Sequence, residues 1–292
     1  MGTSSAYGGP GSGTPLVPTW LEPDSTTPIA PDAVPITDGQ GDVAQSAPNL
    51  VPRDPLLIQL PTNINRFTTA RSNLSRFARS GGSDRSSLGR AVSHYVSTSS
   101  GGAKKAAQRM GSSRKAGGRL LGFLSDTVAR GARAALQTLS LESLAGRPIE
   151  EIFLGLTEYV CPDGGTVDEG IARDAFIETI ADLAENGVTD LNSLTTDQMQ
   201  TVFELYATHA IEDRLCNDVG TKVIVLPSNA RGAERIQAQL RDFIRRGVAD
   251  ALTAAREAMQ ALTPDGVLGF VERMYERAFA ILHVLGQVES ER

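Results

Sequence analysis

The sequence predicts an all-α protein, on three observations. Apolar residues recur at helical spacing along most of residues 62–292. Two capping boxes, which begin at Thr166 and Thr195, mark points where helices start. The one strand-like run, KVIVL at 222–226, has no second strand to pair with, so we interpret it as a buried connector or a helix end.

Composition divides the chain into three parts: a disordered Gly/Pro/Ser-rich N-terminal tail (1–61), a basic helical segment (62–139) and an acidic helical bundle (140–292). The tail holds eleven of the fifteen prolines, and its first 52 residues include five acidic and no basic residues. Such a segment buries too little apolar surface to offset its ordering entropy, so we expect it to be disordered when free. Fully extended at roughly 3 Å per residue, those 52 residues would reach on the order of 150 Å.

Short helices are predicted in the basic segment. The apolar positions near helical spacing are Ile64, Phe67, Leu74 and Phe77 for a first helix and Leu88, Val92, Tyr95 and Val96 for a second. One or two further helices follow over 104–136, and each glycine there weakens an isolated helix by about 1 kcal/mol relative to alanine. We therefore expect this stretch to pack on a surface that accepts small residues.

Five helices are predicted in the acidic bundle, each with an apolar stripe on one face. The stripes span residues 149–160, 172–183, 199–211, 236–259 and 267–285. Pro148 is placed at the first turn of the first of these helices, and Thr263 with Pro264 at the start of the last.

Charge is unevenly distributed along the chain. Residues 53–133 carry fifteen basic and three acidic residues, a net charge of +12, whereas residues 134–292 carry thirteen basic and twenty-six acidic residues, a net charge of −13. The basic stretch suits either a phosphate backbone or acidic protein surfaces, in its own chain or in a partner. We favour charge pairing within proteins, because aromatic residues for base stacking are few. The candidate contact residues are Arg66, Arg71, Arg76, Arg79, Lys104, Lys105, Arg109, Arg114, Lys115 and Arg119.

No catalytic or metal-binding pattern stands out. His94, His209 and His283 are each isolated in the sequence, and Cys161 and Cys216 form no CxxC motif. The run GGPGSGT lacks the lysine, the preceding strand and the following helix of a phosphate-binding loop. We expect neither a metal nor a cofactor, and an enzyme is the least favoured class.

The sequence also bears on where the protein resides. It contains no run of eighteen apolar residues that would predict a membrane span, and its first residues lack the pattern of a secretory signal. Two isolated cysteines fit a reducing compartment. We expect a cytoplasmic protein that is not membrane-bound.

The first twenty residues, MGTSSAYGGPGSGTPLVPTW, carry no charge and end in the only tryptophan of the chain. Removal of the initiator methionine would expose Gly2, whose unhindered α-amine, with a pKa of about 8, suits an acylating enzyme. The myristoylation pattern has Ser or Thr at position 6, where this chain has Ala6. The stretch is therefore either a leader without a role or a peptide that enters another enzyme's groove. In the second case Leu16, Val17 and Trp20 form an apolar docking anchor.

Three stretches resemble the QatB family, a component of the Qat anti-phage defence systems of bacteria. They are the opening twenty residues, the Arg-rich RFTTARSNLSRFARSGG, and HAIEDRLCNDVGTKV at 209–223. In such systems QatB accompanies an ATPase (QatA), a QueC-like protein (QatC) and a TatD-like nuclease (QatD). QueC-like enzymes resemble those that make deazaguanine nucleobases, and related defence enzymes attach such a base to the N-terminal glycine of a partner.

The resemblance implies a non-enzymatic component of a defence complex, with Gly2 as the acceptor of the base and Trp20 as an anchor of the tail. The residues expected to contact the cleft of the QueC-like partner are Thr3, Ser4 and Ser5. A hypothesis from another class remains open: a nucleic-acid-binding adaptor that recruits the nuclease through residues 66–119. A steep loss of DNA affinity with salt would support that adaptor.

Overall fold

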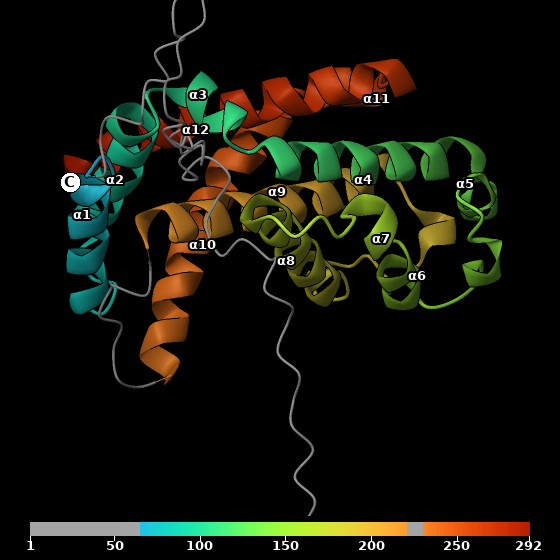
Figure 1. The fold of residues 1–292 in the computed structure, drawn as a ribbon, viewed down its shortest axis with the longest axis horizontal. Helices are drawn as coiled ribbons and strands as arrows, with labels where there is room; N and C mark the ends of the chain where they lie inside the picture. Colours follow the sequence, from blue (N-terminus) through green and yellow to red (C-terminus); the bar gives the residue numbers. More distant parts are fainter. Residues whose placement is uncertain (1–64, 221–229) are drawn as a thin grey trace, which may run out of the picture.

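Helices form every regular element in the two stretches that the computed structural model describes, residues 65–220 and 230–292 (Figure 1). The prediction of an all-α fold is therefore confirmed. The tail (1–61) and the strand-like run at 222–226 lie outside these stretches.

The basic segment contains five α-helices and one π-helical turn. In chain order they are α1 (Thr68–Arg79), α2 (Arg85–His94), the π-helical η1 (Tyr95–Ser99), α3 (Ala103–Gln108), α4 (Gly111–Arg130) and α5 (Ala132–Thr138). The remaining elements are η2 (Glu142–Leu144), α6 (Ile149–Gly155), α7 (Thr157–Val160), α8 (Val167–Asp182), η3 (Leu191–Ser193), α9 (Thr196–Val219), α10 (Ala230–Thr253), α11 (Arg256–Gln260), η5 (Pro264–Gly266) and α12 (Val267–Ser290).

Both predicted capping boxes are present. The Thr166 hydroxyl accepts a hydrogen bond from the backbone N–H of Glu169, and the Glu169 carboxylate accepts one from the N–H of Thr166. Thr195 and Gln198 repeat the arrangement at the start of α9. Each box satisfies two N–H groups that a helix start leaves without intrahelical partners, so these two starts are set by local sequence.

Two stripes predicted as single helices are interrupted. The stripe at 149–160 is divided at Leu156 into α6 and α7, and the stripe at 236–259 is divided between α10 and α11. In the second case the chain turns at Ala255, and the turn directs Met259 into the core. Apolar spacing alone does not reveal such breaks, because the stripe continues in phase across them.

Two long helices, α9 and α12, organise the packing. α12 packs against α2, α3, α4 and α10, and α9 packs against α4, α8 and α10. The buried residues of the basic segment and of the acidic bundle belong to one hydrophobic cluster. A ring contact crosses between the two: Tyr95, which lies 5.8 Å from Phe67 within the basic segment, also lies 6.5 Å from Phe279 in the acidic bundle, measured between ring centroids. The division proposed at residues 139 and 140 remains a prediction.

Glycines allow two of the closest helix contacts. At the crossing of α2 and α12, a Cβ built on Gly89 would lie 2.6 Å from the carbonyl oxygen of Gly286, and the converse distance is also 2.6 Å. In α4 a Cβ on Gly117 would lie 3.1 Å from the ring of Tyr206 on α9. As expected, the glycine-rich stretch packs on a surface that accepts small residues.

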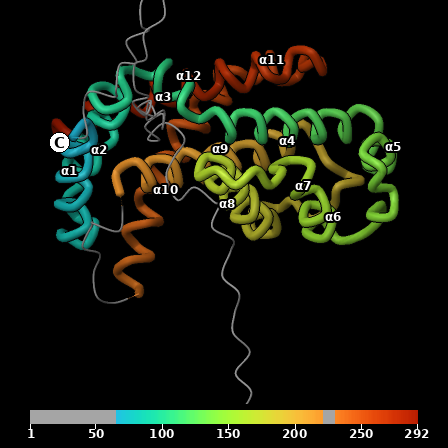
Figure 2. The backbone as a smooth tube through the Cα atoms, in the orientation of Figure 1, coloured from blue at the N-terminus to red at the C-terminus, as the bar shows by residue number. Residues whose placement is uncertain are grey.

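The molecule is long in one direction. Figure 2 shows α4 extending from the side of the molecule that holds α1, α2 and α3 toward α5. The C-terminal end of α12 lies beside α2 on the first side (Figure 1). Among the described residues, no helix is long and apolar enough to cross a membrane.

The α2–α12 crossing gives a direct stability prediction. Gly89→Ala should lower the free energy of unfolding by about 1–3 kcal/mol, because the new methyl group meets backbone rather than a movable side chain. Gly122→Ala is the matched control, since its Cβ meets nothing within 4 Å and should stabilise the helix by up to about 1 kcal/mol. Urea denaturation followed by circular dichroism measures both, and equal effects would contradict the close crossing.

Candidate functional site

The ten basic residues predicted to contact a nucleic acid or an acidic partner fall into two groups. Those that interact with other described parts of the chain are Arg66, Arg71, Arg109, Arg114 and Arg119. Those that are exposed to solvent are Arg76, Arg79, Lys104, Lys105 and Lys115. The exposed five lie on three helices, α1, α3 and α4. Half of the candidate residues therefore contribute to internal contacts.

A buried carboxylate joins the basic segment to the acidic bundle. The side chain of Asp218 on α9 is 0% exposed. Its oxygens accept hydrogen bonds from the Tyr95 hydroxyl at 3.0 Å, from Arg109 at 3.1 Å and from Arg214 Nε at 3.3 Å. Burial raises the pKa of Tyr95, and the adjacent Asp218 raises it further, so the hydroxyl stays protonated and donates. Two guanidinium groups and a hydroxyl thus compensate one buried charge.

Other basic side chains extend this pairing. Arg114 on α4 donates to Glu272 on α12 at 2.8 Å, and Arg119 donates to the carbonyl oxygen of Val160 at 3.1 Å. Arg71 on α1 donates to the carbonyl oxygen of Val219 at 2.5 Å. Each of these contacts links the basic segment to the acidic bundle.

A second buried charged cluster lies between α8, α9 and α10. His209 is 1% exposed; its Nδ1 lies 2.7 Å from Glu178 in an ion pair, and its Nε2 lies 2.9 Å from Asp182. Burial lowers the pKa of His209, but the two carboxylates raise it by more, so the net shift is upward. Arg241 from α10 pairs with Glu178 at 3.2 Å and with Glu212 at 2.7 Å. These groups hold three helices together.

The two cysteines are unsuited to nucleophilic chemistry at neutral pH. Burial raises the pKa of both Cys161 and Cys216 to about 12. Because the thiolate rather than the thiol is the nucleophile, both side chains remain unreactive at pH 7. Within the described stretches, no group of three or more His, Cys, Asp or Glu side chains has a metal-binding arrangement.

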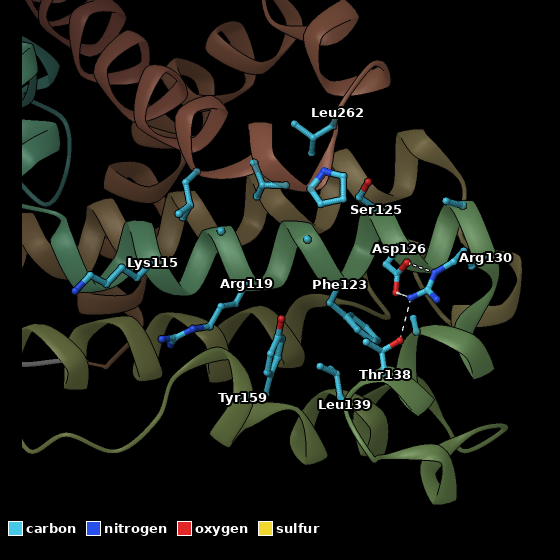
Figure 3. A pocket seen from close by; sticks show the side chains of 17 residues that line it. Lys115, Arg119, Phe123, Ser125, Asp126, Arg130, Thr138, Leu139, Tyr159 and Leu262 are labelled. Atoms are coloured by element: carbon cyan, nitrogen blue, oxygen red, sulfur yellow. Dashed lines mark hydrogen bonds and ion pairs between the residues drawn. The ribbon is translucent and has the colours of Figure 1, made fainter.

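A groove of about 640 Å³ runs along α4 (Figure 3). Its floor is the face of α4 that contains Gly118 and Gly122. One wall comes from the chain before and at the start of α12, namely Leu262, Pro264, Val267 and Leu268. The opposite wall includes Phe123, Tyr159 and Leu139. Residues far apart in the sequence therefore form one largely apolar trough.

Charged side chains mark the two ends of this groove (Figure 3). Lys115 and Arg119 lie toward the N-terminal end of α4. At the other end Asp126 and Arg130 pair with each other, and Arg130 also donates to Thr138 at 3.0 Å. The groove can hold an apolar peptide with carboxylates at its Lys115 end.

The groove brings together only two of the sequence-predicted residues, Lys115 and Arg119. Its walls were not predicted, because they come from segments around residues 139, 159 and 262–268. The one signal was the glycine content of α4, which pointed to close packing but not to an open trough. The tail residues predicted as acceptor, cleft contacts and anchor are outside the described stretches: Gly2, Thr3, Ser4, Ser5, Leu16, Val17 and Trp20.

Comparison with known proteins identifies one family. The sequence matches the family described as Qat anti-phage system associated protein QatB over residues 101–282, more than half of the chain. The matched range includes α4, α9 and most of α12, and it therefore includes the groove floor and Asp218. No curated protein and no solved structure matches the chain significantly.

The Asp218 cluster should contribute strongly to stability. Asp218→Ala leaves Arg109 and Arg214 without their buried counter-ion, so the free energy of unfolding should fall by about 3–5 kcal/mol. Asp197→Ala breaks an exposed pair with Arg256 and should cost no more than about 1 kcal/mol. Denaturant titration of both variants measures the difference. A small effect of Asp218→Ala would contradict the prediction, because it would show that other groups compensate the charges of Arg109 and Arg214.

Asp213 should make stability depend on pH. Burial, with repulsion from Glu178 and Glu212, raises the pKa of Asp213 to about 7. The native state then binds this proton more tightly than the unfolded state, so the contribution of Asp213 to stability is complete below pH 4 and is lost as pH rises through 7.

Between pH 6 and pH 8 the Asp213 contribution to this fall should be about 1 kcal/mol, and Asp213→Asn should remove it. His209 contributes a fall in the same direction, because its pKa is also raised, so the slope decreases in the variant but does not vanish. Urea midpoints at several pH values measure this slope. Asp250→Asn, at an exposed position on α10, should leave it unchanged.

Proposed function

Because the chain belongs to the QatB family of the Qat anti-phage system, we propose that it is a non-enzymatic component of a bacterial anti-phage defence complex. Membership of this system points to partners within the same system. We propose the QueC-like protein (QatC) as the direct partner, with the ATPase (QatA) and the TatD-like nuclease (QatD) in the wider complex, in the cytoplasm.

The observation that carries the non-enzymatic proposal is that charged groups on α9 are buried in ion pairs. His209, Glu212, Arg214 and Asp218 are all buried and all paired with groups outside α9. These residues lie in the stretch 209–223, one of the three that resemble the QatB family. A catalytic acid, base or nucleophile has to reach a substrate, whereas these side chains stabilise the fold. The helical body is therefore proposed as a scaffold.

On this proposal the tail performs the function. Gly2 is the acceptor of a deazaguanine-type nucleobase that the QueC-like partner attaches, because an N-terminal glycine offers an unhindered α-amine. Thr3, Ser4 and Ser5 carry small polar side chains that fit a narrow cleft beside it. The apolar anchor of Leu16, Val17 and Trp20 would hold the tail in place.

Intact mass, with fragmentation of the N-terminal peptide, tests this proposal. The protein is expressed with its neighbouring operon genes, and again without the QueC-like gene. The expected result is an added mass on Gly2 that requires the QueC-like gene. Gly2→Val crowds the amine with a branched side chain and should abolish the added mass. Gly13→Val makes the same chemical change away from the amine and should preserve it.

An unmodified Gly2 under both conditions would contradict the acceptor role. It would direct attention to the second candidate function, the nucleic-acid-binding adaptor. Five exposed basic residues on α1, α3 and α4 favour that candidate: Arg76, Arg79, Lys104, Lys105 and Lys115. Its signature is an affinity for DNA that falls log-linearly with salt concentration.

A further inference from the structure

Apolar side chains that line the α4 groove are exposed to solvent. The Leu268 side chain on its wall is 60% exposed, and Tyr159 on the opposite wall is 37% exposed. Contiguous exposed apolar surface that is hollowed and edged by charge is typical of a binding site. An occupant of this groove should therefore offer large apolar side chains.

Glycine at the floor gives the groove its depth. A Cβ on Gly122 would meet nothing within 4 Å, so the space above this position is open. A Cβ on Gly118 would lie 2.7 Å from the Leu268 side chain, so Leu268 leans over the floor there. The trough above Gly122 has room for a bulky side chain such as an indole.

The charges at the groove ends restrict the occupant further. Lys115 is exposed and Arg119 is half-buried, and both lie at the end nearest the start of α4. At the other end the Asp126 carboxylate is already paired with Arg130. A complementary peptide would place its apolar side chains over Gly122 and its carboxylates beside Lys115 and Arg119.

The chain itself contains such a peptide. Residues 16–24 read LVPTWLEPD, in which apolar side chains are followed at once by Glu22 and Asp24. The first 52 residues contain no basic residue that would repel Lys115. Two prolines within the nine residues reduce the conformational entropy lost on binding.

The place where the described fold begins favours one direction for the peptide in the groove. The described fold begins at Asn65, three residues before α1, and α1 lies on the side of the molecule where α4 begins (Figure 2). We place the exit of residues 25–64 at the Lys115 end of the groove, which faces this side of the molecule. This direction places Glu22 and Asp24 next to Lys115 and Arg119, and Trp20 deeper in the trough. The forty linking residues have a typical end-to-end distance on the order of 35 Å as a flexible chain, which allows binding within one molecule.

We propose that residues 16–24 bind in the α4 groove of their own chain, with Trp20 above Gly122 and with Glu22 and Asp24 facing Lys115 and Arg119. This inference deepens the proposed function and rests on it for one point only, the role of Gly2 as the acceptor. With residues 16–24 bound, residues 2–14 extend beyond the groove and keep Gly2 near the helical body. A flexible tether of forty residues keeps the local concentration of the peptide in about the millimolar range, so a weak binding site suffices.

Fluorescence of the full-length protein tests the proposal, because Trp20 is the only tryptophan in the chain. Acrylamide quenching of Trp20 should be severalfold weaker than quenching of a free peptide of residues 11–30. Gly122→Leu fills the trough and should raise the quenching constant to that of the peptide. Gly170→Leu is the matched control, because this exposed position on α8 also has nothing within 4 Å of its Cβ and lies away from the groove.

A charge reversal tests the proposed direction. Lys115→Glu should weaken the protection of Trp20, whereas Arg133→Glu, on exposed α5 surface outside the groove lining, should not. Circular dichroism of each variant confirms that the helical body is intact.

Three results would overturn the proposal. They are quenching of wild-type Trp20 equal to that of the free peptide, protection that survives Gly122→Leu, and protection lost on dilution, which would place the tail in the groove of a second copy. Mass measurement of Gly2 keeps the two proposals distinct. A modified Gly2 with an unprotected Trp20 removes this inference alone, and an unmodified Gly2 with a protected Trp20 removes the acceptor role alone.

Discussion

The buried carboxylate of Asp218 is the constraint on which the arrangement of the helices depends. A charge with no exposure to solvent needs partners close by, and here they come from three elements: Tyr95 in η1, Arg109 just after α3, and Arg214 within α9. Arg214 also reaches Asp168 in α8 at 2.7 Å. Because the partners must converge on one point, the basic segment has one position on the acidic bundle that satisfies them all. The opposite net charges of the basic segment and the acidic bundle are explained in part by these pairings.

Glycine serves two opposite purposes in the same molecule. At Gly89, Gly286 and Gly117 the absence of a side chain lets helices approach until a methyl group would clash. At Gly122 the same absence faces open space and leaves a trough. A helix rich in small residues thus packs closely on α9 with one face and borders an open groove with another. The packing against α9 explains how α4 tolerates residues that weaken isolated helices.

In the proposed function, the helical body and the tail have different roles. The body buries its titratable groups in pairs that hold α8, α9, α10 and the basic segment together, which suits a scaffold better than a catalyst. The tail carries the groups that the proposed chemistry needs, an unhindered amine and an aromatic anchor. The groove is the feature of the body whose shape and charge complement the tail, and it connects the two roles.

The sequence by itself determined the features that depend on residues close together in the chain. The helix starts at Thr166 and Thr195 were predictable because a capping box is a contact over three residues, and the all-α class was predictable from apolar spacing. Only the tertiary structure decided which arginines face inward. Arg109 pairs with Asp218, while Lys105, four residues earlier, is exposed, and nothing in the local pattern separates them. The breaks at Leu156 and Ala255 and the walls of the groove likewise arise from contacts between residues distant in the chain, which spacing along one helix does not encode.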